Sequence, residues 1–171
     1  MIFLRRFFAS APIRAITFML IRISRTSGRI ASFVRTRALF PNCLDVYCHW
    51  STEVTHPERI TIGKRVVIGP EGSLGGAAGI YIGDDVLLSK GVFVHTGTAD
   101  ISTPPPYRRM AKPIRIESGV WLGAYSRVLA GVTIGANSIV AAGVIVRKSV
   151  PPGSFVTDAK NRVQPFVGTT E

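Results

Sequence analysis

The chain has 171 residues, is 46% hydrophobic and carries a formal net charge of +11 at pH 7. The length suits a single domain, and the hydrophobic content is sufficient for a real core. Eight arginines and no acidic residue lie within residues 1–37, so the basic excess belongs to the N-terminus. A charge confined to one end does not favour a nucleic-acid partner, and none is expected.

Residues 1–45 are predicted to form a basic amphipathic arm. Ser10 and Pro12 are suitable signals for a helix start. Arginines interrupt every apolar run, so neither a membrane-spanning helix nor a signal peptide is expected. Two interpretations are open and compatible: residues 1–37 lie on an anionic membrane surface, or they cap the following domain or a neighbouring subunit. The predicted apolar face holds Ile13, Ile16, Leu20, Ile23 and Ile30, and the opposite face holds Arg14, Arg22, Arg25 and Arg29.

Cys43 and Cys48 follow the arm, and we expect both to be reduced thiols. Reduced thiols without a signal peptide indicate a cytoplasmic protein. If the arm binds lipid, we expect a peripheral protein at the inner face of the membrane.

Residues 46–157 contain a six-residue repeat, which fits neither the helical period of 3.6 nor the strand period of 2. A short strand plus a turn, stacked on itself, has this period, and three such units close one coil of about 18 residues. The sequence therefore predicts a parallel β-solenoid of about four to five coils. The repeating aliphatic residues are Ile62, Ile68, Leu74, Ile82, Leu88 and Val94, then Ile116, Leu122, Val128, Ile134, Val140 and Val146.

One long break interrupts the repeat between Val94 and Ile116. Residues 97–112 fit no repeat unit, and a loop of this length in a compact coil is usually functional. Its polar residues Tyr107, Arg108 and Arg109 suggest a polar or anionic substrate. Residues 158–171 are predicted to form a C-terminal tail.

The repeats resemble those of the hexapeptide-repeat acyltransferases. The segments that carry the resemblance are Ile80-Tyr-Ile-Gly-Asp-Asp-Val-Leu-Leu-Ser-Lys, Lys112-Pro-Ile-Arg-Ile-Glu-Ser-Gly-Val-Trp-Leu-Gly-Ala, and the stretch from Ala130 to Pro152. The resemblance is strongest to the colanic-acid and maltose-type sugar O-acetyltransferases. It implies a left-handed parallel β-helix, a homotrimer, and a catalytic loop that reaches over a neighbouring subunit.

The resemblance also locates the catalytic base. The family carries a histidine in a motif like Thr-Gly-Ser-His-Asp, and this chain reads Thr96-Gly-Thr-Ala-Asp100. Ala99 therefore stands where the base is expected, and a methyl group cannot accept a proton. Three explanations are open: an engineered inactive variant, a natural branch that uses another residue or none, or a substitute base at His95. Asp100 matches the residue after the family histidine and is a candidate to orient an imidazole or bind a hydroxyl.

The resemblance further implies acetyl-CoA as donor, with no metal. Three histidines occur in the chain, and they do not have the spacing of a three-histidine zinc site. Trp121 matches a position that lines the active cleft. The implied CoA contacts are Ala124, Ala142, Arg147, Lys148 and Arg162.

These inferences predict an acetyl-CoA-dependent O-acetyltransferase that acts on a sugar or on a polysaccharide or lipid-linked glycan precursor. The alternative is a non-catalytic β-helix scaffold that binds CoA, a glycan or a protein partner. Ala99 keeps both alternatives open.

Overall fold

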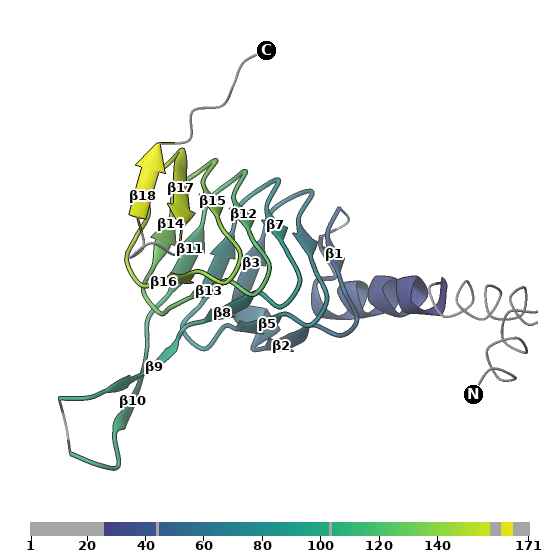
Figure 1. Ribbon diagram of the computed structural model, residues 1–171. Coiled ribbons are helices and arrows are strands. Elements are labelled where there is room, and N and C mark those ends of the chain that lie inside the picture. The colour runs from purple at the N-terminus through teal and green to yellow at the C-terminus, as the bar shows by residue number, and fades with distance from the viewer. Residues whose placement is uncertain (1–25, 44, 103, 158–161, 166–171) are drawn as a thin grey trace, which may run out of the picture.

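The computed structural model describes residues 26–43, 45–102, 104–157 and 162–165. Short parallel strands wind through about five turns around one core, with a helix at the end where β1 lies and a hairpin projecting sideways (Figure 1). The predicted β-solenoid with an N-terminal helix and one extruded loop is therefore confirmed. The turns stack their strands into three flat faces, and the complete turns contribute one strand to each face.

The three faces are distinct sheets in the same chain order. The first face holds β1 (Tyr47–Cys48), β4 (Val67–Ile68), β7 (Leu87–Leu88), β12 (Trp121–Leu122), β15 (Ile139–Val140), β17 (Ser154–Thr157) and β18 (Arg162–Pro165). The second face holds β2 (Glu53–Thr55), β5 (Ser73–Gly75), β8 (Phe93–His95), β13 (Arg127–Val128) and β16 (Ile145–Val146). The third face holds β3 (Ile60–Ile62), β6 (Ile80–Ile82), β11 (Ile114–Ile116) and β14 (Thr133–Ile134).

The core consists of aliphatic residues that stack in register from turn to turn. On the first face Ile68 pairs with Leu88, Leu88 with Leu122, and Leu122 with Val140. All four are buried, because each strand points one residue inward and its neighbours outward. On this face a small residue follows each of these inward positions and permits the stacking. A Cβ added at Gly123 would lie 2.6 Å from the backbone nitrogen of the next turn.

The corner between the second and third faces is the place where the solenoid is interrupted. It contains the 3-10 helix η1 (Pro57–Arg59) in the first turn and residues 76–79 in the second. In the third turn a hairpin leaves at this corner, formed by the antiparallel strands β9 (Gly97–Asp100) and β10 (Arg108–Ala111). The Lys112 backbone N–H donates to the carbonyl of Thr96 at 2.9 Å, which closes the hairpin at its root. The solenoid then resumes in register at β11.

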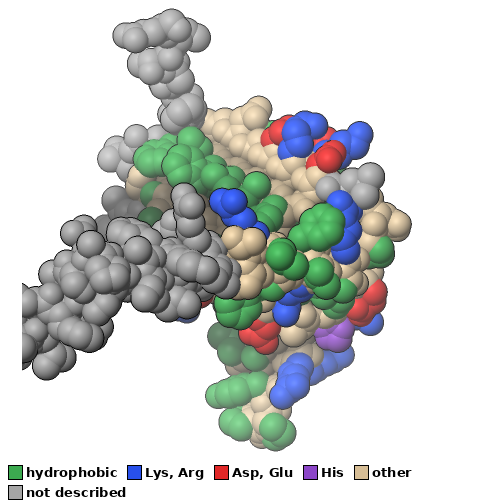
Figure 2. Space-filling view, turned by 90° about the vertical axis from the view of Figure 1, so that its right-hand side faces the viewer, with side chains coloured by type: hydrophobic (Ala, Val, Ile, Leu, Met, Phe, Trp, Pro, Cys, Tyr) green, Lys and Arg blue, Asp and Glu red, His purple; other side chains and the backbone are tan. Residues whose placement is uncertain are grey.

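A helix over residues 26–39 packs against the first turn through its polar side chains. Ser32 and Thr36 are buried, whereas Ile30, Phe33 and Val34 are exposed. Ile13, Ile16, Leu20 and Ile23, predicted for the apolar face, and Arg14, Arg22 and Arg25, predicted for the basic face, lie outside the described residues. Figure 2, which faces this end of the molecule, shows hydrophobic side chains gathered on its surface with basic side chains among them. Within the described part of the chain, no helix is long and apolar enough to cross a bilayer.

The two cysteines and the C-terminal segment lie at opposite ends of the solenoid. Cys48 is buried in β1, and burial raises the pKa of its thiol. Cys43 is half-buried, and both are free thiols. At the other end β18 pairs antiparallel with β17. Part of the segment predicted as a tail thus extends the first face.

Candidate active site

The hairpin β9–β10 carries most of the residues that the sequence suggested for catalysis and substrate binding. Ala99 lies opposite Arg109 and Asp100 opposite Arg108 in the antiparallel pair. Ala99, Arg108 and Arg109 are exposed, as is Tyr107 beside them. Asp100 accepts hydrogen bonds from the backbone N–H and the hydroxyl of Ser102, and these bonds lower the pKa of its carboxyl group. The position of the family histidine is therefore an open methyl group on a projecting ribbon.

His95 lies at the root of this hairpin, at the end of β8, and its ring is held on several sides. The imidazole stacks on the ring of Phe93, with 3.8 Å between ring centroids and an angle of 7° between planes. Its Nε2 lies 2.8 Å from the hydroxyl oxygen of Ser73 in the preceding turn. That hydroxyl in turn lies 3.5 Å from a carboxylate oxygen of Glu53, one turn further back. Three successive turns of the second face thus place a carboxylate, a hydroxyl and an imidazole in one row.

The row allows a tautomer of His95 that suits a general base. When Ser73 donates its proton to Glu53, its oxygen is available to accept from Nε2–H of the imidazole. The other ring nitrogen, Nδ1, then keeps its lone pair. A neutral imidazole with a free lone pair is the form that a general base requires.

The ring position depends on Gly75, which lies directly beside His95 in the sheet. A Cβ added at Gly75 would lie 2.6 Å from Nδ1, closer than side chains tolerate. Burial of the ring against this glycine lowers the pKa of His95, while the charge of Glu53 raises it. Burial has the larger effect, so His95 is held neutral near neutral pH.

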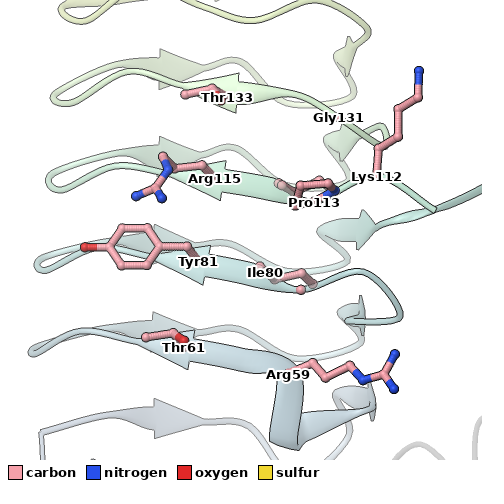
Figure 3. Close-up of a pocket in the computed structure, with 11 residues that line it drawn as sticks. Arg59, Thr61, Ile80, Tyr81, Lys112, Pro113, Arg115, Gly131 and Thr133 are labelled. Atoms are coloured by element: carbon pink, nitrogen blue, oxygen red, sulfur yellow. The ribbon is translucent and has the colours of Figure 1, made fainter.

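A groove of about 600 Å³ lies on the third face beside the root of the hairpin. Figure 3 shows Tyr81 and Arg115 side by side on the strands, while Arg59 and Lys112 extend away from the strands near the corner. The guanidinium of Arg115 lies 4.4 Å from the centre of the Tyr81 ring. Since the cations do not converge on one point, the groove is an open basic surface rather than a closed anion site. The remaining lining residues are Thr61, Gly79, Ile80, Pro113, Ile114, Gly131 and Thr133.

Three other predicted residues, Trp121, Ala124 and Ala142, lie at or next to the corner between the first and second faces. Trp121 points outward from β12 and donates its indole N–H to the hydroxyl of Ser89 at 3.0 Å. Ala124 and Ala142 are neighbours in successive turns, because the carbonyl of Ala124 accepts from Gly143 N–H. Small side chains there leave room for the close approach of a narrow ligand.

Sequence reasoning missed two more residues at this corner, Lys90 and Tyr125. Tyr125 is exposed, and Gly91 must lack a side chain because an added Cβ would lie 2.3 Å from the Tyr125 ring. The ammonium of Lys90 bonds Glu71 at 3.0 Å, and this contact raises the pKa of Lys90. No sequence pattern distinguished them, because lysine and tyrosine are common residues in turns.

The predicted site residues thus form two clusters on opposite edges of the second face. One edge carries Trp121, Ala124 and Ala142. The other carries His95 and the hairpin, with Arg147 and Lys148 exposed at the equivalent corner two turns later. Arg162 begins β18, where its backbone pairs with Thr157. A single chain does not bring the two clusters together.

Among the described residues, no group of three or more His, Cys, Asp or Glu side chains could hold a metal ion. His56 is exposed beside Glu58, and His49 bonds Ser51.

Two family models match the repeats of this solenoid. The bacterial transferase hexapeptide (six repeats) matches residues 113–148, and the hexapeptide repeat of succinyl-transferase matches residues 59–95. The two matches cover both runs of the six-residue period and leave out the hairpin. The chain therefore carries the repeats of the bacterial hexapeptide transferases.

Solved structures of acetyltransferases are similar to this chain over 67% to 94% of its length. The acetyltransferase VCA0836 of Vibrio cholerae O1 biovar eltor, solved with acetyl-coenzyme A, is 27% identical over 94% of this chain and 92% of its own, with a TM-score of 0.69. A maltose O-acetyltransferase of Clostridium difficile 630 is 25% identical over 67% of this chain and 62% of its own, with a TM-score of 0.62. A galactoside acetyltransferase solved with coenzyme A is 26% identical over 67% and 59%, with a TM-score of 0.60. No curated protein sequence matches the chain.

The row Glu53, Ser73 and His95 was only partly visible from sequence. His95 was a candidate from its place before the loop. Glu53 and Ser73 were missed, because they lie 42 and 22 residues before His95 and meet it only through stacking of turns.

Proposed function

We propose that this protein transfers an acetyl group from acetyl-CoA to a hydroxyl of a sugar or glycan precursor, with His95 as general base. The observation that carries the proposal is the imidazole of His95, held neutral by burial and oriented by Ser73 at the root of the hairpin. The family fold and the acetyl-CoA bound to VCA0836 support the donor. The maltose and galactoside acetyltransferases support a sugar acceptor.

The chemistry follows from the free lone pair on Nδ1. His95 takes the proton of the acceptor hydroxyl as its oxygen forms a bond to the thioester carbonyl carbon. The carbon–sulfur bond then breaks, and the imidazolium returns its proton to the departing sulfur. The products are an acetyl ester and free CoA. A proton on Nε2 throughout keeps the bond to Ser73 in place.

The donor is proposed to lie along the small residues Ala124 and Ala142 of one subunit, with Arg162 of that subunit and Arg147 and Lys148 of the neighbouring subunit binding its phosphates. Because Trp121 and these alanines lie on the edge opposite His95, one complete site needs two copies of the chain. A homotrimer, in which each hairpin reaches the neighbouring subunit, satisfies this requirement at three equivalent sites.

The test measures release of CoA thiol from acetyl-CoA with a panel of sugar and amino-sugar acceptors. We expect activity in this chain and a loss of about 10²–10⁴-fold in His95→Ala, the range that removal of a general base produces. His56→Ala is the matched control, since His56 is exposed and bonds Glu58 rather than the proposed site. An inactive chain that is rescued strongly by Ala99→His would refute His95 as base.

The second candidate is a non-catalytic scaffold that binds CoA, a glycan or a protein, and the exposed methyl group of Ala99 favours it. The scaffold predicts binding of CoA without turnover in this chain and in His95→Ala alike. Activity that disappears in His95→Ala excludes it.

A further inference from the structure

The helix over residues 26–39 is attached to the solenoid by its polar side. The hydroxyl of Thr36 accepts the Cys48 backbone N–H at 3.0 Å and donates to the carbonyl of Ser32 at 2.7 Å. The hydroxyl of Ser32 accepts the Trp50 backbone N–H at 3.0 Å. Arg35 donates to the carbonyl of Thr52 at 2.9 Å. These bonds fix which side of the helix faces the protein.

The opposite side of the helix is apolar and open to solvent. Ile30, Phe33 and Val34 are 59%, 62% and 59% exposed, and Trp50 on the neighbouring turn is 50% exposed. An amphipathic helix on the surface of a globular protein normally buries its apolar side. Here the side with large hydrophobic residues is the one left free. We call these four residues the apolar helix face.

A shallow groove of about 590 Å³ runs along the apolar helix face, lined by Ile30, Val34 and Trp50 with Ser27, Ala31 and Arg35. The surroundings are basic. Arg29 is exposed on the helix, and the guanidinium of Arg37 lies 5.3 Å from the centre of the Phe33 ring. No acidic residue occurs in residues 1–37. The face therefore combines exposed aliphatic and aromatic groups with cations at its edge.

We propose that the apolar helix face docks the protein onto an anionic lipid surface. Apolar side chains enter the boundary between headgroups and acyl chains, a tryptophan lies at the interface, and arginines bind lipid phosphates. This combination of groups matches the composition of the face. A second copy of the chain fits less well, because it would place two arginine-rich surfaces against each other in a protein of net charge +11. The docking is independent of the proposed acetyl transfer.

The test is flotation of the full chain with vesicles of phosphatidylcholine containing phosphatidylserine, and with vesicles of phosphatidylcholine alone. The double variant Phe33→Ser, Val34→Ser removes apolar groups that make no core contact. We expect its partitioning onto the anionic vesicles to fall by about 10-fold or more. Each apolar side chain that enters the lipid removes apolar surface from water, and this burial stabilises the bound state. Ile101→Ser is the matched control, because Ile101 is an 85% exposed apolar residue on the hairpin side, and it should bind as the parent does.

A second measurement reports on the apolar helix face itself and not on residues 1–25. In Trp121→Phe, Trp50 is the single tryptophan, and we expect its fluorescence to be quenched by bromine-labelled lipid in the anionic vesicles. Equal flotation of the parent and the double variant, or absence of quenching, overturns the proposal. A change in oligomeric state in the double variant with unchanged flotation also overturns it, and assigns the face to a second copy of the chain.

Discussion

At the scale of single residues, the central feature is His95 and the two residues that orient it. Ser73 fixes the ring through Nε2, and Glu53 lies behind Ser73. Gly75 provides the space in which the ring lies. We regard Ser73, Glu53 and Gly75 as positioning residues, because they act on His95 rather than on a substrate. Their effect is to present a neutral base with a defined tautomer.

Replacing Glu53 tests this arrangement through pH dependence. The charge of Glu53 raises the pKa of His95, so Glu53→Gln should lower that pKa further. A base with a lower pKa stays unprotonated to lower pH, and the acid limb of the kcat/KM profile should therefore move to lower pH. Glu58→Gln serves as control, since Glu58 contacts His56 and Arg59 instead. An acid limb that does not move would show that His95 is not the group that titrates.

At the scale of the elements, each strand divides its residues between the core and the surface with a strict alternation. In β7 the two residues have the same chemistry and opposite environments. Leu88 is fully buried and in register with Ile68 and Leu122, whereas Leu87 is 39% exposed. The same division explains why Trp121, beside the buried Leu122, is available to a ligand or a neighbouring subunit.

The pair in β7 gives a stability prediction with an internal control. Leu88→Ala should lower the free energy of unfolding by about 2–5 kcal/mol, because it opens a cavity between stacked turns. Leu87→Ala should cost much less, since its side chain already contacts water. Chemical denaturation of both variants measures the difference. Equal losses would mean that the outward side of the first face is covered in the assembled protein.

At the scale of the whole molecule, the solenoid separates the candidate site into two edges. The hairpin leaves the solenoid at one corner, with His95 at its root, and Trp121, Ala124 and Ala142 lie at or next to another. Stacked turns are rigid, so no bending of one chain can join the two edges. The proposed function therefore requires assembly, and the hairpin is the element with the reach to provide it.

Mixing two inactive variants tests whether the site is shared between subunits. His95→Ala and Trp121→Ala should each have low activity alone. If subunits of a trimer mix at random from equal amounts, about a quarter of the interfaces combine an intact His95 with an intact Trp121. Activity should then recover to that fraction after joint refolding. Failure to recover, with mixed trimers demonstrated by mass spectrometry, would place the complete site within one chain.

The sequence by itself determined the solenoid, its turns and the position of the extruded loop, because a six-residue period allows one inward residue per strand and any long break must lie outside the stack. It identified His95 by its place just after the last regular repeat, whereas Ala99 was identified by the resemblance to the family motif. Only the tertiary structure decided that Glu53 and Ser73 stand behind His95, since those contacts arise between turns and leave no local pattern. The same holds for the helix. Its composition predicted an amphipathic arm, but the hydrogen bonds of Ser32 and Thr36 to the first turn decided which side remains exposed.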